Sequence, residues 1–243
     1  AVPGGRRSLC ISSSHTGAAQ GARGGIAVMV SDAPVVVRPR LRGVIHRWSV
    51  PVAVVLFAVL AFRVTGAGNV AAVLVYGACV TAMLAVSAVY HSGRLSPSAV
   101  AKLKRVDHST ILLAIAGSYT AVITLALTGT TQTVLLVVTW VAAAIGISIR
   151  LFWLHAPYPV VATVYVVVGW MALIDLPAYL DALTRGELTL VVIGGLLYTA
   201  GAVVYALHKP NPWPSTFGYH ELFHALVVVA ALAQYLAVFS LAG

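Results

Sequence analysis

The chain has 243 residues, of which 60% are hydrophobic and only 9% are charged, and its mean hydropathy is +0.96. A soluble domain carries about 25% charged residues, so this composition excludes an ordinary soluble domain and indicates an integral membrane protein. The net charge of +9 does not indicate nucleic-acid binding, because the basic residues flank apolar segments and are explained by orientation in a membrane. Cys10 and Cys79 are too few for a disulfide framework or a cysteine-based zinc site.

We expect two regions, a disordered basic tail over residues 1–43 and a membrane domain over residues 44–243. The tail is rich in Gly, Ser, Ala and Arg and lacks hydrophobic periodicity. It contains no apolar core before a cleavage site, so we expect no signal peptide there. The chain begins without methionine, and one hypothesis is that the true start is Met29.

Seven apolar segments, each close to the ~20 residues that a bilayer requires, follow the tail. They cover residues 48–66, 69–91, 107–128, 132–153, 158–178, 188–208 and 219–241. They are apolar on all sides, which is typical of membrane helices rather than of barrel strands. The sequence therefore predicts an all-α, polytopic membrane protein, a bundle of seven transmembrane helices.

The positive charges predict the orientation of this bundle. With the N-terminus in the cytoplasm, all of the 15 lysines and arginines except Arg63 and Arg185 fall on the cytoplasmic side. Cytoplasmic loops carry the excess of positive charge, so we expect a cytoplasmic N-terminus and a C-terminus outside. The expected location is the plasma membrane, the inner membrane of a bacterium, with multiple passes.

Polar residues gather at the predicted cytoplasmic ends of three spans. Ser87 and His91 are four residues apart and share one face at the end of the second span. Asp107 begins the third span, and His220 and His224, also four apart, begin the seventh. If these three helices are neighbours, three imidazoles, one carboxylate and one hydroxyl meet at one membrane depth.

Zinc suits such a group, because catalytic zinc usually has three protein ligands and keeps a fourth position open. We assign His91, His220 and His224 as zinc ligands, Asp107 as the base that accepts a proton from water, and Ser87 as a hydrogen-bond partner. Taken singly, each histidine is also explained as an interfacial anchor, and Asp107 as a charge favoured at a helix N-terminus. Magnesium prefers oxygen ligands and fits less well.

Other polar residues are expected to lie away from this group. His108 is about 100° around the helix from Asp107, and Glu221 directly follows His220, so both should point off the ligand face. Asp175, in the fifth span, is expected to be a hydrated residue that breaks the helix, with a second functional role as the alternative. Three further histidines are expected at the membrane interface: His46, His155 and His208.

Around these residues the sequence resembles the haemolysin III family, the bacterial branch of the progestin and adipoQ receptor group. The matching strings are Ser87-x-x-x-His91, Arg105–Ser109 with Gly117–Thr120, and Phe217–His224, and the likeness extends over residues 42–243. It implies a seven-helix bundle with a cytoplasmic N-terminus. It further implies a zinc ion held by His91, His220 and His224, with a water between the metal and Asp107 and with Ser87 near that water.

Two residues depart from the family pattern. Gln234 stands where many relatives have another histidine, and Ala121 stands where a proline often follows the equivalent of Thr120. Neither is a proposed ligand, so the prediction of a metal site is unaffected. They leave the substrate and the subgroup open.

The favoured function is a zinc-dependent hydrolase of lipid amide or ester bonds, because the resemblance extends to eukaryotic relatives with reported ceramide-hydrolysing activity. Its partners would be zinc and membrane lipid. The alternative is a receptor-like or membrane-homeostasis protein with structural zinc, so enzyme against receptor stays open. A haemolysin or cytolysin is disfavoured because the sequence has no amphipathic pore segment, and a transporter because no span pattern repeats.

Overall fold

The computed structural model of the chain describes residues 39–93, 95–153 and 156–243. The predicted tail falls mostly on residues 1–38, and His155 also lies outside the described residues. Within the described residues the chain is helical and contains no strand. The described part of the chain is therefore all-α, as the sequence predicts.

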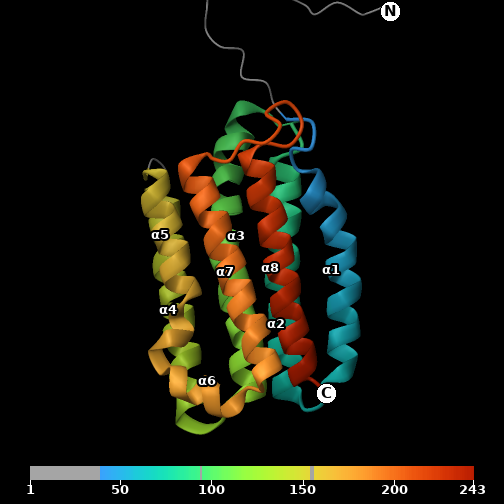
Figure 1. Ribbon diagram of the computed structural model, residues 1–243, viewed down its shortest axis with the longest axis vertical. Coiled ribbons are helices and arrows are strands. Elements are labelled where there is room, and N and C mark those ends of the chain that lie inside the picture. The colour runs from blue at the N-terminus through green and yellow to red at the C-terminus, as the bar shows by residue number, and fades with distance from the viewer. Residues whose placement is uncertain (1–38, 94, 154–155) are drawn as a thin grey trace, which may run out of the picture. The chain divides into compact units, whose positions relative to one another are not determined.

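Eight α-helices and one short 3-10 helix form the described fold (Figure 1). They are α1 (Val44–Arg63), α2 (Ala67–Tyr90), α3 (Pro97–Ala126), α4 (Gly129–Phe152), α5 (Tyr158–Gly169), η1 (Met171–Asp175), α6 (Leu176–Ala182), α7 (Arg185–Leu207) and α8 (Tyr219–Leu241). Because α5, η1 and α6 together make one span, seven stretches are long and apolar enough to cross a membrane. The predicted bundle of seven transmembrane helices, and a multi-pass membrane protein, are confirmed. The side of the membrane on which each terminus lies stays a prediction.

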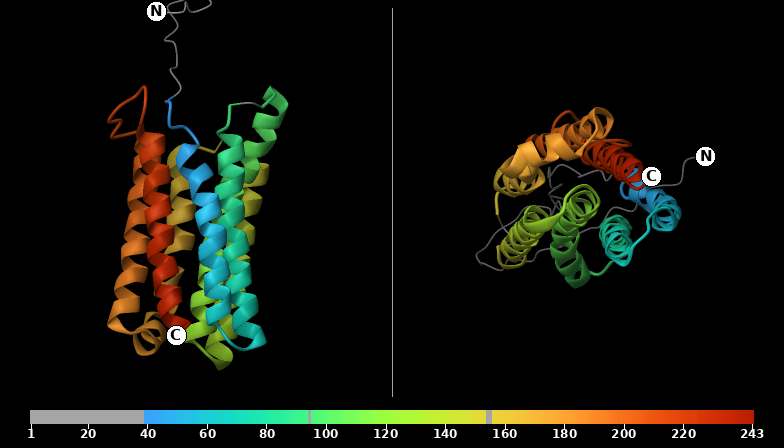
Figure 2. Two further views of the ribbon diagram at one scale, coloured as in Figure 1. Left: turned by 90° about the vertical axis from the view of Figure 1, so that its right-hand side faces the viewer. Right: turned by 90° about the horizontal axis from the view of Figure 1, so that it is seen from below.

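The helices follow one another around a ring (Figure 2). Each helix from α1 to α5 packs on the next, α5 packs on α7, α7 on α8, and α8 returns to α1. The long helix α3 contacts α2, α4, α5 and α8, so it occupies the most central place. We call the end at which α1, α3, α5 and α8 begin the histidine end, since all six histidines of the described residues lie there: His46, His91, His108, His208, His220 and His224.

The third helix begins well before the span predicted at residue 107. Pro97 occupies the first turn, and the Ser96 hydroxyl accepts a hydrogen bond from the Ala99 amide at 3.4 Å, which is a favoured helix start. The first turns carry Lys102 and Lys104, and hydropathy alone does not mark such a polar extension as part of a span. Asp107 consequently lies well inside α3 rather than at its N-terminus.

The fifth span is broken where α5 ends. The Tyr119 hydroxyl donates a hydrogen bond to the Gly169 carbonyl at 2.7 Å and accepts one from the Ala172 amide at 3.0 Å. Backbone groups freed within a membrane must find partners inside the protein, and Tyr119 supplies two of them. Asp175 accepts a hydrogen bond from the Ala178 amide and caps α6, which agrees with its expected place at a helix break.

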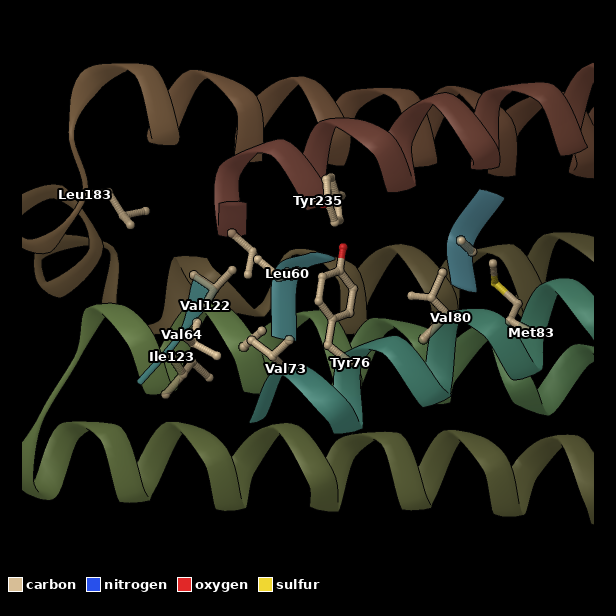
Figure 3. Close-up of a cluster of buried hydrophobic side chains, with 14 of the residues drawn as sticks. Leu60, Val64, Val73, Tyr76, Val80, Met83, Val122, Ile123, Leu183 and Tyr235 are labelled. Atoms are coloured by element: carbon tan, nitrogen blue, oxygen red, sulfur yellow. The ribbon is translucent and has the colours of Figure 1, made fainter. Parts of the chain in front are cut away.

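The packed core is largest in the half of the bundle away from the histidine end. Figure 3 shows part of it, with Leu60, Tyr76 and Tyr235 among the labelled side chains. Phe57 of α1 contacts the rings of Tyr76 and Tyr235, with ring centroids 4.7 and 5.7 Å apart. The Tyr235 hydroxyl also donates a hydrogen bond to the Leu56 carbonyl at 3.0 Å. These contacts fix α1, α2 and α8 against one another. The same three helices carry histidines at their other ends.

Glycine allows α2 and α3 to approach closely. A Cβ added at Gly117 of α3 would lie 2.8 Å from Cys79 Cβ and 3.3 Å from Tyr76 Cα, both on α2. This contact aligns the end of α2 with the part of α3 that carries Asp107. The adjacency of the second and third spans, which the sequence left open, is therefore present in the structure.

Candidate metal site and adjoining cavities

Three histidines from two separate helices meet at the histidine end. Ring nitrogens of His91, His220 and His224 all lie within 4.8 Å of one another. His91 Nε2 is 3.1 Å from His220 Nε2, and the His91 and His224 ring centroids are 5.0 Å apart. His91 and His224 are buried and His220 is half-buried. These three neighbouring histidines can hold a metal ion, and their role as ligands stays a prediction.

The start of α8 explains how two of these histidines are held. Glu221 accepts a hydrogen bond from the Gly218 amide at 2.9 Å, so it caps the helix in the same first turn that carries His220. Its carboxylate also pairs with Arg42, just before α1. His220 and His224 are one helical turn apart and therefore face the same way. Glu221 points off the ligand face, as predicted.

His46 of α1 is a fourth member of the cluster, and its prediction as an interfacial residue is wrong. Its ring is buried, and His46 Nε2 lies 3.0 Å from His224 Nδ1. The ring faces the protein because α1 packs against α8 at this point. His46 occupies the first turn of an apolar helix at the same end as His220, and that shared depth was the signal in the sequence that could have found it.

The nitrogen atoms present fit a divalent metal. Two imidazole nitrogens bound to tetrahedral zinc at 2.0–2.1 Å lie about 3.3 Å from each other, close to the observed 3.1 Å between His91 and His220. His224 Nε2 is buried and has no hydrogen-bond partner among the described residues. Its other nitrogen contacts His46, which takes the place of the hydrogen-bond partner that commonly orients a metal-binding histidine. A buried set of imidazoles is suited to zinc and to other transition metals.

A small cavity of about 30 Å³ joins the histidines to the predicted polar partners. Ser87, Asp107, His220 and His224 all line it, and Ser87 and Asp107 are both buried. Because α3 begins at Pro97, Asp107 is not explained as a charge that favours a helix N-terminus. The structure thus brings all five predicted site residues to one place, with His91 at the edge of the same cluster.

His108 also lies at this cavity, and Arg150 contacts it from behind. His108 was expected to point away, but its ring lines the same 30 Å³ space. Its Nδ1 is in contact with Nη2 of Arg150, and the Arg150 side chain is only 2% exposed. The expectation for His108 is wrong because the cavity extends around α3 beyond the face that carries Asp107. Residues of α5 and α7 line this part of it.

A second, largely apolar cavity of about 130 Å³ lies beside the first. The two spaces share six lining residues: Met83, Ile111, Tyr165, Ala202, Phe223 and Val227. The larger cavity extends to the broken fifth span, where Leu173 and Leu176 line it and are themselves 57% and 38% exposed. It therefore leads from the histidine cluster toward the outer surface of the bundle. The sequence showed the helix break but not this cavity.

The fold and this site together define a class, a seven-helix membrane protein with a buried histidine cluster at one end of the bundle. The chain matches the haemolysin-III related family over residues 35–235, and it belongs to that family. The family resemblance inferred from the motifs is confirmed.

Individual relatives agree with this assignment. The chain is 28% identical over 181 residues to Hemolysin-3 of Bacillus cereus, covering 74% of this chain and 78% of that protein. It is 30% identical over 136 residues to the Hemolysin-3 homolog of Bacillus subtilis (strain 168), covering 56% of this chain and 61% of the relative's length. A shorter match is to the Adiponectin receptor protein of Drosophila melanogaster, with 37% identity over 62 residues. It covers 24% of this chain and 14% of that protein.

Proposed function

We propose that this protein is a zinc-dependent hydrolase that cleaves amide or ester bonds of membrane lipids. The observation that carries the proposal is the position of two neighbouring cavities. A small cavity lined by Asp107, Ser87 and four histidines lies beside an apolar cavity of about 130 Å³ that reaches the broken fifth span, and the two share part of their lining. A lipid has the matching chemistry, with a polar bond next to a long apolar chain.

His91, His220 and His224 would hold the metal, which when bound supplies Lewis-acid chemistry at a carbonyl and makes a nearby water more nucleophilic. Asp107 would accept a proton as this water adds to the carbonyl carbon. The bond from that carbon to nitrogen or oxygen then breaks, and Asp107 returns the proton to the leaving amine or alcohol. Ser87, on the same cavity wall, would donate a hydrogen bond that orients the water or the carbonyl.

The apolar cavity would bind the acyl chain. Met83, Phe223 and Val227 line both cavities, so a chain that starts at the histidine cluster passes between them. The predicted cytoplasmic N-terminus would place the reacting bond near the inner leaflet. In that arrangement the chain of the lipid would enter from the membrane between η1 and α7.

The experiment uses the purified full chain in lipid nanodiscs with panels of N-acyl and ester lipids, and mass spectrometry detects the released fatty acids. We expect turnover by zinc-loaded protein that stops on chelation and returns with zinc. Zinc-loaded wild-type protein without chelator-sensitive turnover would refute the proposal. A lysis assay on red cells with the same preparation tests the activity to which the names of the bacterial relatives refer.

A structural metal is the second candidate, and one contact favours it. His46 of α1 touches His224 of α8, and His91 from the end of α2 joins the same cluster. A metal held by His91, His220 and His224 would tie the end of α2 to α8, and the contact of His46 with His224 would link α1 to them. In that case Asp107→Asn would leave function intact, whereas His220→Ala would lower the melting temperature of the bundle and release the metal.

A further inference from the structure

The Arg150 guanidinium is a buried cation with no carboxylate within salt-bridge distance in the part of the chain that the structure describes. Nε and Nη1 of Arg150 are buried and have no hydrogen-bond partner among the described residues. Among the described residues, the ion pair within salt-bridge distance joins Arg42 to Glu221 and does not involve Arg150. A buried charge is costly unless it is paired or serves a ligand, so this arginine calls for a functional explanation.

The contact between Arg150 and His108 determines which ring nitrogen of His108 carries the proton. Arginine has only donors and is not deprotonated in proteins, so the Arg150 Nη2 group donates and His108 Nδ1 must accept. A neutral imidazole has one donor and one acceptor, which places the remaining proton on His108 Nε2. The Tyr165 hydroxyl donates to the His108 carbonyl at 3.0 Å and helps to hold this residue in place.

The Nε2 atom of His108 points toward Tyr205, which lines the small cavity with it. The Tyr205 hydroxyl lies 3.5 Å from Nε2, at the limit of hydrogen bonding. The Tyr205 ring also lines the cavity, and its centroid is 5.9 Å from that of His220. An N–H donor backed by a buried cation thus stands beside the histidine cluster with little of its hydrogen-bonding capacity used.

We propose that His108 binds the carbonyl oxygen of the substrate and the carboxylate of the fatty acid product through Nε2–H, with Arg150 as its positioning residue. The inference rests on the proposed function, because that function supplies the acyl group. The cavity also contains the Asp107 carboxylate, which repels a second carboxylate. The Arg150 charge offsets this repulsion, and a donor aimed at developing negative charge favours the reaction.

The test compares two ligands with the same chain and different head groups, oleate and oleyl alcohol. Binding to the zinc-loaded full chain in detergent is measured by native mass spectrometry for wild type, His108→Phe and His108→Gln. Phe keeps a ring without a donor, whereas the Gln amide places an N–H near the position of Nε2. We expect His108→Phe to weaken oleate binding about 10- to 100-fold, the worth of a hydrogen bond to a charged group. Oleyl alcohol binding should be unchanged, and His108→Gln should restore oleate binding.

A second measurement reads the tautomer without any ligand. Nitrogen-15 NMR of histidine-labelled protein, assigned with His108→Gln, should show protonated Nε2 and unprotonated Nδ1. A proton on Nδ1 would overturn the inference, and so would equal weakening of both ligands in His108→Phe. Neither experiment needs turnover, so a failed hydrolysis assay and a failed His108 assay are separate results.

Discussion

The strongest test of the metal site is the removal of a residue that is not a predicted ligand. His46 Nε2 lies 3.0 Å from His224 Nδ1, and both rings are buried. This contact fixes the ring of His224 so that its Nε2 faces the cluster. Loss of such a partner of a metal-binding histidine typically weakens metal affinity by about 10- to 100-fold, or about 1.4–2.7 kcal/mol. We expect His46→Leu to show a loss of this size.

The assay is a competition titration of zinc against a chromophoric chelator, with the metal content of the protein checked by mass spectrometry. His46→Gln serves as the rescue, because its amide reaches the position of Nε2 and offers a donor and an acceptor. His208→Asn is the matched control, since His208 lies at the end of α7 with a positive φ of 56° that asparagine also tolerates. Zinc affinity of His46→Leu equal to wild type would refute the orienting role, as would an equal loss in His208→Asn.

Three further predictions concern the Asp107 carboxylate, the close contact of Gly117 with α2, and the ion pair between Arg42 and Glu221. Asp107→Asn should keep the bound zinc but lose lipid hydrolysis by about 100-fold or more, measured as fatty acid release, and full activity would exclude Asp107 as the base. Gly117→Ala should destabilise the bundle by about 1–3 kcal/mol in a thermal melting experiment, because the added Cβ would lie 2.8 Å from a side chain of α2. Gly68→Ala is the control in that experiment, because the space around Gly68 is open. Arg42→Gln should lower the melting temperature by leaving the Glu221 carboxylate buried without its cation, and Glu221→Gln in the same chain should recover part of the loss.

The sequence was most informative where hydrophobicity and spacing act along a single helix. Seven apolar stretches predict seven spans because a bilayer sets the length of each one. The four-residue spacing of His220 and His224 predicts a shared face because a helix has a fixed pitch. Both predictions use only residues that are near one another in the chain.

The parts that the sequence missed depend on how helices pack. His46 was assigned to the interface because nothing within α1 shows that α8 covers it. The angle between neighbouring residues on a helix predicts that His108 points away from Asp107, yet the cavity extends far enough around α3 to include both. The burial of Arg150 could not be predicted either, since a basic residue near the end of a span is normally a charge that flanks the membrane. Each error came from treating one helix without its neighbours.

The position of His46 also bears on whether the metal would be catalytic or structural. A structural zinc site is normally closed by four protein ligands, whereas a catalytic site keeps one position open. Within the described residues, three histidines meet the distances for a shared ion and His46 is not among them. The Nε2 atom of His46 instead contacts Nδ1 of His224, which leaves Nε2 of His224 as the nitrogen available to a metal. The space next to the three histidines is the cavity that Asp107 and Ser87 line. If the three histidines hold the metal as we propose, the adjoining carboxylate and cavity favour a catalytic over a structural ion. Tetrahedral coordination of zinc by four nitrogens in the wild type, measured by X-ray absorption, would reverse this conclusion.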